Sequence, residues 1–287
     1  MQVRLAIPNK GRLQEPAIRV LEDAGIGTVD KAARQLFAKT RDPELELIFV
    51  RAQDIPSLVE KGAADMGITG LDLILESGAK LAELLDLKFG SAKMVVAASE
   101  RSGIKSPKDL KPGLKVATEF PNLARKYFSG KKIKAEISRI SGSAEITPLI
   151  GTADVIVDLT STGTTIKVHG LRVIESLFES TARLVANPRS LRVKKEKIER
   201  IKTALESVVR AKGKKLVMMN VPEKSLEKIK NAMPGMSGPT VSRVESAERM
   251  LAVQAVVAAE LVDEVVQKVK KAGARDILVI PIERVLP

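Results

Sequence analysis

One stretch of the chain, Glu145 to Thr165, most limits the fold that the sequence can adopt. Its centre, Ala153 to Val157, is a short apolar run rich in β-branched residues, which is typical of a buried strand in a parallel sheet. Asp158 follows this run, and five hydroxyl residues then surround Gly163 before a helix-like segment begins at Ile166. A strand that passes through a loop of small residues into a helix predicts an α/β domain.

The loop after Asp158 is a candidate phosphate site. Backbone N–H groups converge where a strand runs into a helix, the helix dipole is positive there, and hydroxyls add donors. Asp158 itself cannot serve a phosphate, because an ionised carboxylate only accepts hydrogen bonds, but it can accept them from ribose hydroxyls. The alternative is an ordinary turn and helix cap. The succession of a strand, an acidic residue, a loop of hydroxyl residues with a glycine, and a helix favours a site for a sugar 5′-phosphate. The loop lacks the GK[ST] ending of a P-loop, which argues against a P-loop NTPase.

This stretch resembles the signature of the ATP phosphoribosyltransferases, which catalyse the first step of histidine biosynthesis. The residues that match the signature are Glu145, Gly151, Ala153, Asp158, Ser161, Thr162, Gly163 and Thr165. Further likeness runs from PNKGRL near the N-terminus to SGPTVS near residue 240, so the resemblance spans essentially the whole chain. The length of the chain and its C-terminal segment resemble those of the long form of the family, which carries its own regulatory domain.

The resemblance implies a reaction, a cofactor and an inhibitor. The phosphoribosyl group of phosphoribosyl pyrophosphate (PRPP) is transferred to N1 of ATP, and pyrophosphate is released. The residues are compatible with this reaction because it needs no protein nucleophile, only positioning and stabilisation of the leaving group. We expect Mg²⁺ on the substrate phosphates, with no protein ligand assigned to it. Family members are inhibited by histidine and form dimers and hexamers, so we expect a homo-oligomer.

The resemblance and the positions of residues at strand ends together predict the site residues. The predicted catalytic set is Lys10, Arg12, Arg51, Glu145 and Asp158. The predicted PRPP-binding set is Asp158, Thr160, Ser161, Thr162, Gly163, Thr164 and Thr165. The predicted ATP-binding set is Lys10, Gly11, Arg12, Gly70, Asp72 and Glu119. The effector set that the resemblance implies is Asn220, Ser237, Thr240 and Ser242.

Several of these residues also have ordinary alternative roles. Lys10 and Arg12 by themselves are common surface charges, and only the resemblance of PNKGRL places them beside the active-site cleft. Asp72 is either a helix N-cap or a polar wall of the site. Glu145 either favours a helix dipole or, by resemblance, faces PRPP. The SGPTVS segment alone would be a turn.

The order of strands and helices predicts three parts. Two α/β lobes joined by a double crossover, similar to type II periplasmic binding proteins, would be formed by residues 1–91 with 175–211 and by residues 92–174. A cleft between the lobes would hold the substrates. Residues 212–287 follow a βαββαβ pattern, which predicts a ferredoxin-like regulatory domain. Within this scheme we expect helices over 143–149 and 193–212.

Composition limits the other functional classes. The chain carries a net charge of +13, but it has one Tyr, six Phe and no Trp, so it lacks the residues that stack on nucleic-acid bases. Polyanionic small substrates suit this charge better, and we treat clusters such as Lys194, Lys195 and Lys197 as solvated faces. No apolar run approaches the ~20 residues of a membrane span, and the N-terminus has no signal-peptide pattern, so we expect a cytoplasmic protein.

Two non-catalytic alternatives remain. A two-lobed chain could be a solute-binding protein, although the missing secretion signal and the terminal βαββαβ unit argue against it. A basic two-lobed chain could also sense an effector while binding nucleic acid, but no helix-turn-helix pattern precedes the first strand. His169, the only histidine, has no visible partner and is read as a surface residue rather than a general base.

Overall fold

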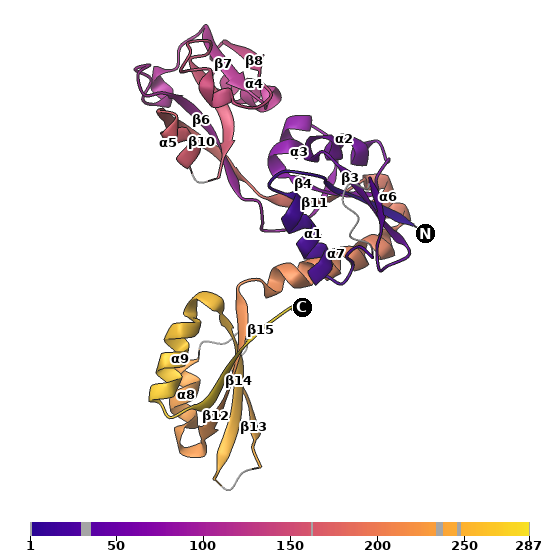
Figure 1. Cartoon of the computed structure of the whole chain (residues 1–287), viewed down its shortest axis with the longest axis vertical. Helices are drawn as coiled ribbons and strands as arrows, with labels where there is room; N and C mark the ends of the chain where they lie inside the picture. Colours follow the sequence, from indigo (N-terminus) through magenta and orange to yellow (C-terminus); the bar gives the residue numbers. More distant parts are fainter. Residues whose placement is uncertain (1, 30–35, 162, 234–237, 246–247, 287) are drawn as a thin grey trace. The chain divides into compact units, whose positions relative to one another are not determined.

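The computed structural model describes residues 2–29, 36–161, 163–233, 238–245 and 248–286 of a mixed α/β chain (Figure 1). It divides into two compact units, Met1–Leu205 and Glu206–Pro287. Each unit is described by itself. Among the described residues, no helix is both long and apolar enough to cross a membrane.

The first unit begins with a six-stranded sheet in the order β2-β3-β1-β4-β11-β5. Its strands are β1 (Val3–Pro8), β2 (Phe37–Lys39), β3 (Leu45–Val50), β4 (Met66–Gly70), β5 (Ala82–Asp86) and β11 (Ala182–Ala186). β3, β1 and β4 are parallel, and β11 runs antiparallel to β4. The helices of this lobe are α1 (Gln14–Asp23), α2 (Ile55–Glu60) and α3 (Leu71–Ser77). α1 buries Ala17, Val20 and Leu21, the face that the sequence period predicts.

A five-stranded sheet forms the second lobe, in the order β10-β6-β9-β7-β8. Its strands are β6 (Ala92–Ser99), β7 (Leu114–Thr118), β8 (Ala135–Arg139), β9 (Val155–Thr160) and β10 (Leu171–Ser180), and its helices are α4 (Pro121–Gly130) and α5 (Thr164–Val168). β8, β7 and β9 are parallel. Val116, Val155 and Val157 of this sheet pack in one core with Phe128 of α4. The β-branched run that predicted a buried strand therefore lies at the centre of this lobe.

Two segments connect the lobes. The chain leaves the first sheet after β5, builds the second sheet from β6 to β10, and returns at Thr181 to begin β11. The segments are paired: Leu87 N–H donates to Ala182 O, and Ala182 N–H donates to Phe89 O, both at 2.9 Å. This confirms the predicted double crossover and the two-lobed fold class. The lobe boundary predicted between residues 174 and 175 falls inside β10, which pairs with β6 as far as Ser180.

Two predicted helices differ in the structure. The segment 143–149 forms only the 3₁₀ turn η3 (Ala144–Ile146), because Ser143 is left-handed at φ 53° and Pro148 has no N–H for a helix. The helix predicted over 193–212 is α7 (Lys195–Ala211), and a short helix that was not predicted, α6 (Pro188–Val193), precedes it and is separated from it at Lys194. Lys194 reaches away to Asp65 at 2.8 Å. The remaining 3₁₀ turns are η1 (Ala52–Asp54), η2 (Pro107–Asp109), η4 (Glu223–Ser225) and η5 (Ala259–Leu261).

The second unit has the predicted βαββαβ order. Its elements are β12 (Lys214–Pro222), α8 (Leu226–Ala232), β13 (Thr240–Arg243), β14 (Met250–Ala258), α9 (Val262–Lys271) and β15 (Arg275–Pro281). The sheet order β13-β14-β12-β15, with every pair antiparallel, is that of a ferredoxin-like domain. Alternate residues of β12 and β14, such as Val217 and Val253, pack against Ile229 and Val269 of the two helices, which lie on the same side of the sheet (Figure 1).

Helices α3 and α4 connect the two lobes by side-chain contact. The Glu76 carboxylate in α3 accepts hydrogen bonds from the N–H groups of Asn122 and Leu123, at 3.0 and 2.9 Å, in the first turn of α4. Asn122 Nδ2 also donates to Glu76 O at 2.9 Å. These amides have no partner within their own helix, so Glu76 acts as a cap supplied by the other lobe.

Replacing Glu76 by alanine is therefore expected to lower the free energy of unfolding by about 1–2 kcal/mol, the usual cost of a lost helix cap. Denaturant titration of the full chain measures this change. Glu15→Ala is the control, because Glu15 forms an exposed pair with Arg19 at 3.2 Å and such pairs contribute little. Equal stabilities of the two variants would contradict a capping role for Glu76.

Candidate active site

The carboxyl edge of the first sheet collects the predicted cationic residues. β3, β1 and β4 end side by side, since Pro8 pairs with Val50 and Ala6 pairs with Gly67. Arg51 follows β3, Lys10 and Arg12 follow β1, and Asp72 follows β4. The side chains of Lys10 and Arg51 are exposed. Chain topology thus places the three predicted cations on the edge where open α/β sheets bind ligands.

Arg12 is held by two groups at this edge. Its Nη2 pairs with Asp72 Oδ1 at 3.3 Å, and its Nη1 donates to the carbonyl of Gly90. Asp72 is only 2% exposed and also accepts a hydrogen bond from the Ser180 hydroxyl. The N-cap of α3 is Gly70, and the Asp72 N–H in the first turn donates to the Ser180 hydroxyl oxygen, so the Asp72 carboxylate is not the cap. Asp72 therefore faces Arg12 rather than capping α3.

Two glycines make room for this arrangement. A Cβ on Gly70 would collide with the carboxylate of Asp72. Gly90 has φ 61°, and a Cβ there would collide with Leu13 and lie 3.1 Å from Arg12 Nη1. The backbone can approach Asp72 and Arg12 closely only because both positions lack a side chain.

The carboxyl edge of the second sheet collects carboxylates. β7 and β9 are parallel with Thr118 opposite Val157, so Glu119 and Asp158 emerge on neighbouring strands. Glu119 Oε1 accepts a hydrogen bond from Gly142 N–H at 2.6 Å, which fixes the approach to the turn that carries Glu145. Asp158 lies within β9 rather than after it, because the strand continues to Thr160. Its Oδ1 accepts from the N–H of Leu159 at 2.7 Å.

The carboxyl group of Asp158 has a raised pKa. Its partial burial, opposed by the hydrogen bond from Leu159 and reinforced by the negative charges of Glu119 and Glu145, raises its pKa to about 6. A carboxylate that resists ionisation in a group of acids is typical of a functional site. Within the described part of the chain, no three acidic or histidine side chains are grouped so as to hold a metal ion.

The hydroxyl loop follows β9 directly. Gly163 N–H donates to Thr160 Oγ1 at 2.9 Å, and Gly163 adopts φ 73°, which forms the turn before α5. Ser161 and Thr164 are exposed. Thr162 lies outside the described residues, and so does the side chain of Thr165. Thr160 therefore stabilises the turn, and Ser161 and Thr164 are exposed residues of the loop that follows Asp158 along the chain.

The described effector residues share one face of the second unit. Asn220 and Ser242 both lie opposite Ala252, and Thr240 lies opposite Gln254. Residues directly opposite each other on neighbouring strands point to the same face. Asn220 also donates to Asp276 Oδ2 at 2.9 Å. Ser237, the remaining effector prediction, lies outside the described residues.

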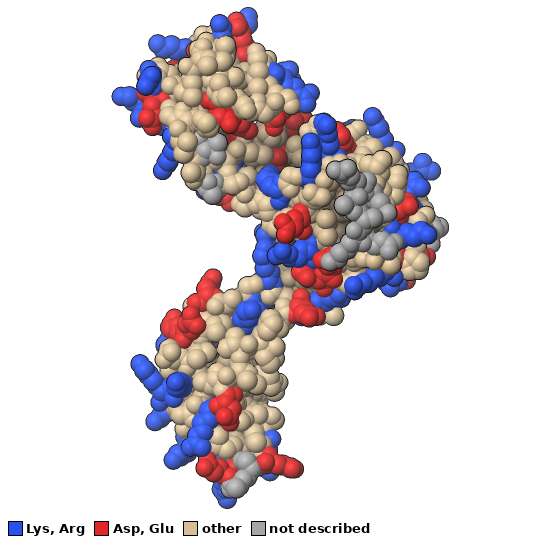
Figure 2. All heavy atoms as spheres, in the orientation of Figure 1, with Lys and Arg blue, Asp and Glu red and all other residues tan. Residues whose placement is uncertain are grey.

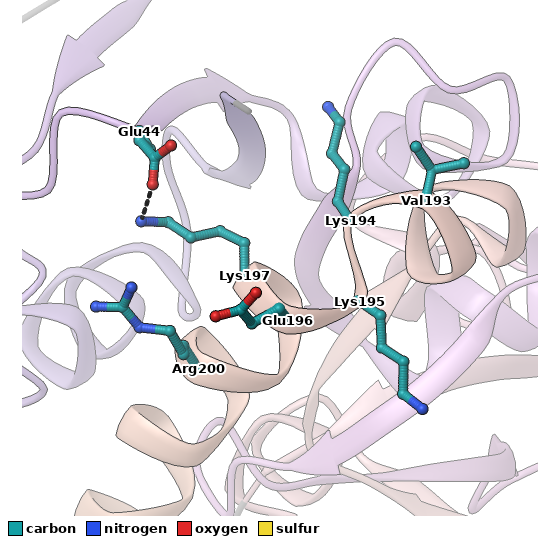
Figure 3. Close-up of a pocket in the computed structure, with 7 residues that line it drawn as sticks. All are labelled: Glu44, Val193, Lys194, Lys195, Glu196, Lys197 and Arg200. Atoms are coloured by element: carbon teal, nitrogen blue, oxygen red, sulfur yellow. Dashed lines mark hydrogen bonds and ion pairs between the residues drawn. The ribbon is translucent and has the colours of Figure 1, made fainter.

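A basic pocket lies apart from these residues. It is lined by Glu44, Val193, Lys194, Lys195, Glu196, Lys197 and Arg200 (Figure 3). Lys197 pairs with Asp42 and Glu44 at 2.6 and 3.1 Å, and the hydrogen bond from Lys197 lowers the pKa of Asp42. Lys194 and Lys197 are thus paired, not the solvated residues expected from the sequence. They join α7 to the first sheet, so we read this pocket as structural.

On the face drawn in Figure 2, charge does not gather into one basic area. On the face drawn in Figure 2, lysine and arginine alternate with aspartate and glutamate over both units. A nucleic-acid groove would appear as a continuous basic stripe. The face drawn in Figure 2 shows no such stripe.

Two residues of the first site were missing from the sequence prediction. Ser180 and Gly90 bind Asp72 and Arg12, but they lie 108 and 78 positions away from those partners along the chain. No local motif marks either residue. Only the pairing of the two crossover segments brings them to the end of β1, and that pairing is not readable from local sequence.

Comparison with known proteins gives a consistent result. The ATP phosphoribosyltransferase (HisG) family model matches residues 51–207, and the model for the HisG C-terminal domain matches residues 211–284. The chain is 53% identical to the ATP phosphoribosyltransferase of Methanosarcina barkeri over 290 residues, covering 99% of this chain and 100% of that protein. It is 53% identical to the enzyme of the same name from Methanopyrus kandleri over 285 residues, with 99% and 100% coverage.

A solved structure agrees with these relatives. The ATP phosphoribosyl transferase (HisG:HisZ) complex from Thermotoga maritima contains a chain that is 31% identical and superimposes with a TM-score of 0.63. The match covers 71% of this chain and 99% of that one. The chain described here therefore belongs to the ATP phosphoribosyltransferase family, whose reaction is the first step of histidine biosynthesis.

Proposed function

We propose that this chain joins N1 of ATP to C1 of PRPP between the residues of the two sheet edges. One observation supports this most directly: cations end the strands of the first sheet, whereas carboxylates and a hydroxyl loop end those of the second. A phosphorylated sugar needs both donors for its phosphate and acceptors for its hydroxyls. A purely polyanionic ligand would not suit an edge that carries Glu119, Glu145 and Asp158.

PRPP is assigned to the second edge. Exposed hydroxyls of Ser161 and Thr164, with the loop amides, would donate to the 5′-phosphate, and Asp158 would accept from the ribose hydroxyls. We keep Thr160, Thr162, Gly163 and Thr165 in this assignment as loop members. Glu145 is proposed to face the ribose, and its influence on the pKa of Asp158 supports a position nearby.

ATP and the leaving pyrophosphate are assigned to the first edge. Lys10, Arg12 and Arg51 would offset the charge of the triphosphate or pyrophosphate. Gly11 and Gly70 would let the backbone approach the nucleotide, and Asp72 takes part through its pair with Arg12. Glu119 is proposed for the nucleotide side.

The chemistry is a displacement at C1 of the ribose. The N1 lone pair of ATP forms the new N–C bond while the bond from C1 to the pyrophosphate oxygen breaks, and the electron pair leaves with pyrophosphate. The protein contributes orientation of both substrates and stabilisation of the leaving group. No protein group forms a covalent bond in this step.

Mg²⁺ is the proposed cofactor. The carboxylates of Glu119, Glu145 and Asp158 are oxygen ligands of the kind that this ion prefers, although they do not form a group able to hold it among the described residues. An ion carried mainly by the substrate phosphates would need few protein ligands, and Glu119 or Glu145 would supply a carboxylate to it. When bound, Mg²⁺ supplies neutralisation of the pyrophosphate charge.

A direct assay tests the proposal. Purified chain with ATP, PRPP and MgCl₂ should release pyrophosphate and form N1-(5-phosphoribosyl)-ATP, detected by mass spectrometry. Omitting ATP or PRPP, or adding a chelator, should abolish both products. Pyrophosphate release at the rate of the protein-free mixture would favour a solute-binding or effector-sensing protein instead.

We also propose that the second unit binds histidine as a feedback inhibitor. The placement of Asn220, Thr240 and Ser242 on one sheet face supports a shared site, because side chains on one face can contact one ligand. Millimolar histidine is expected to lower the rate, and Asn220→Ala is expected to weaken that inhibition roughly tenfold, as for one lost polar contact. Asn231→Ala, an exposed residue of α8, is the control and should leave inhibition unchanged. Insensitivity of the parent chain to histidine would remove this role.

Two further proposals follow from the family. We place residues 212–287 as the regulatory part, and we propose a homo-oligomer, with dimer and hexamer as the forms to look for by light scattering. A cytoplasmic location is proposed because both substrates are cytoplasmic metabolites.

A further inference from the structure

We propose that Ser180 is a positioning residue for Arg12 and acts through the carboxylate of Asp72. The inference rests on the function proposed for Arg12, which is to offset phosphate charge at the first sheet edge. It adds a residue from the second crossover segment to a site built at the end of β1.

The first observation is the close engagement of Ser180 with Asp72. The Ser180 hydroxyl donates to Asp72 Oδ1, while its oxygen accepts a hydrogen bond from Asp72 N–H at 3.1 Å. Ser180 is completely buried and Asp72 is 2% exposed. The backbone N–H of Asp72 holds the Ser180 oxygen in place, and the Ser180 hydroxyl in turn fixes the carboxylate. Turning the carboxylate away would lose both the hydrogen bond from Ser180 and the pair with Arg12.

The second observation concerns the guanidinium that this carboxylate holds. Arg12 pairs with Asp72 through Nη2 and with the Gly90 carbonyl through Nη1. A guanidinium has five N–H donors, so three remain for a ligand. The Arg12 side chain is 32% exposed, which leaves a way for a phosphate to reach those donors. Because the Arg12 guanidinium is already held in position, less entropy is lost when it binds a phosphate.

The third observation is where the two holding groups come from. Gly90 lies between β5 and β6, and Ser180 ends β10 directly before Thr181. These are the two segments that connect the lobes. The position of Arg12 is therefore set by the crossover segments and not by the loop after β1 alone.

A double-mutant cycle tests this assignment. Ser180→Ala is expected to lower kcat/KM roughly tenfold when Arg12 is present, the usual size of a lost hydrogen bond to a charged group. In an Arg12→Ala background the same change should have almost no further effect, because the residue that Ser180 positions is gone. A purely structural role would lower activity by the same factor in both backgrounds, and that result would overturn the proposal.

Chemical rescue gives a second readout. Guanidinium ion is expected to restore part of the activity of Arg12→Ala, because the Asp72 carboxylate and the Gly90 carbonyl that bind the Arg12 side chain remain in place. It should not restore activity in Arg12→Ala/Ser180→Ala. Equal rescue in both variants would contradict a positioning role for Ser180.

The matched control is Thr181→Val. Thr181 is the next residue, and its hydroxyl also bonds a carboxylate, but that carboxylate is Asp86 at 2.7 Å. This variant should keep the activity and leave the rescue of Arg12→Ala unchanged. If Ser180→Ala fails to fold, Asp72→Asn enters the same cycle, since it removes the charge while keeping an acceptor for Ser180. Full activity of Arg12→Ala would reject the proposed role of Arg12 itself, whereas additive effects would reject only the positioning by Ser180.

Discussion

Replacing Asp158 by asparagine is expected to lower kcat/KM for PRPP roughly a hundredfold while making the substrate-free protein more stable. The loss follows from removal of a charged acceptor, because hydrogen bonds to charged groups are worth about 1.5–3 kcal/mol each. An asparagine keeps the shape and can still accept the hydrogen bond from Leu159 N–H. The substitution therefore isolates the charge of the carboxylate from its packing.

The gain in stability follows from the raised pKa. Partial burial, with the charges of Glu119 and Glu145, raises the pKa of Asp158 to about 6, so the folded state holds the proton more tightly than the unfolded state does. Between the ordinary carboxyl pKa of about 4 and pH 6, folding takes up a proton, and stability of the parent protein falls as pH rises through this window. Above it the penalty is constant, and at pH 8 the asparagine variant should be more stable by on the order of 2 kcal/mol.

Denaturant titrations at pH 4 and pH 8 measure this difference, which should nearly vanish at the lower pH. In kinetics, kcat/KM for PRPP of the parent protein should fall below about pH 6 as free Asp158 takes up a proton, and this fall should be absent from the variant. Any fall caused by ionisation of PRPP itself would persist in the variant.

Asp154→Asn is the control for this experiment. Asp154 lies just before β9 and is exposed, with Oδ2 accepting from Lys115 N–H at 2.7 Å. Neither activity nor the pH profile should change in that variant. An Asp158→Asn protein with normal PRPP kinetics would refute the assignment of the ribose to this carboxylate.

The sequence predicted the secondary-structure elements whose pattern lies within a short segment of the chain. The β-branched run Ala153–Val157 and the helical spacing of the apolar residues in α1 both predicted elements that the structure contains. Patterns of this kind are visible within about ten residues of sequence. The double crossover and the ferredoxin-like order also followed, because both depend on the succession of such elements.

The sequence did not predict features that depend on the backbone conformation of one residue or on contacts between residues far apart in the chain. The 143–149 helix was wrong because left-handed Ser143 and Pro148 limit it to a single turn. β10 was missed because its pattern is irregular, with shifts of register between Val173 and Glu175 and between Ser176 and Phe178. Ser180 and Gly90 were missed because only the fold brings them to Arg12.

The residues of the candidate site likewise include some that the sequence predicted and some that it did not. Strand-end positions found Lys10, Arg51 and Glu119, since parallel strands bring their carboxyl ends to one edge. The group of three carboxylates at the second edge was not foreseen as a group, because Glu119, Glu145 and Asp158 come from three separate segments. The burial of Asp158, which raises its pKa, and the two negative charges that add to this effect exist only in the folded chain.

Replacing Gly67 by alanine is expected to cause a large loss of stability in the first lobe through a single added methyl group. Gly67 is the second residue of β4, between β1 and β11, and α2 packs directly on it. A Cβ there would lie 2.5 Å from Ile55 Cγ2 and 2.9 Å from Val59 Cγ2. Both neighbours are β-branched and fully buried, so neither can rotate away, and α2 must move. Overpacking of this kind costs about 1–3 kcal/mol.

The displacement should also reach the active site. α2 follows η1, where Ala52 O accepts a hydrogen bond from Thr69 Oγ1 at 2.8 Å, and Arg51 directly precedes that turn. A shift of α2 therefore moves the predicted phosphate-binding Arg51, and we expect kcat/KM to fall together with the denaturation midpoint. Gly130→Ala, at the end of α4 with open space around its Cβ, is the matched control, and it should be neutral or stabilising by about 0.5 kcal/mol. If Gly67→Ala unfolds at the same denaturant concentration as Gly130→Ala, the contact between α2 and β4 is looser than the structure describes, and Arg51 is not positioned by it.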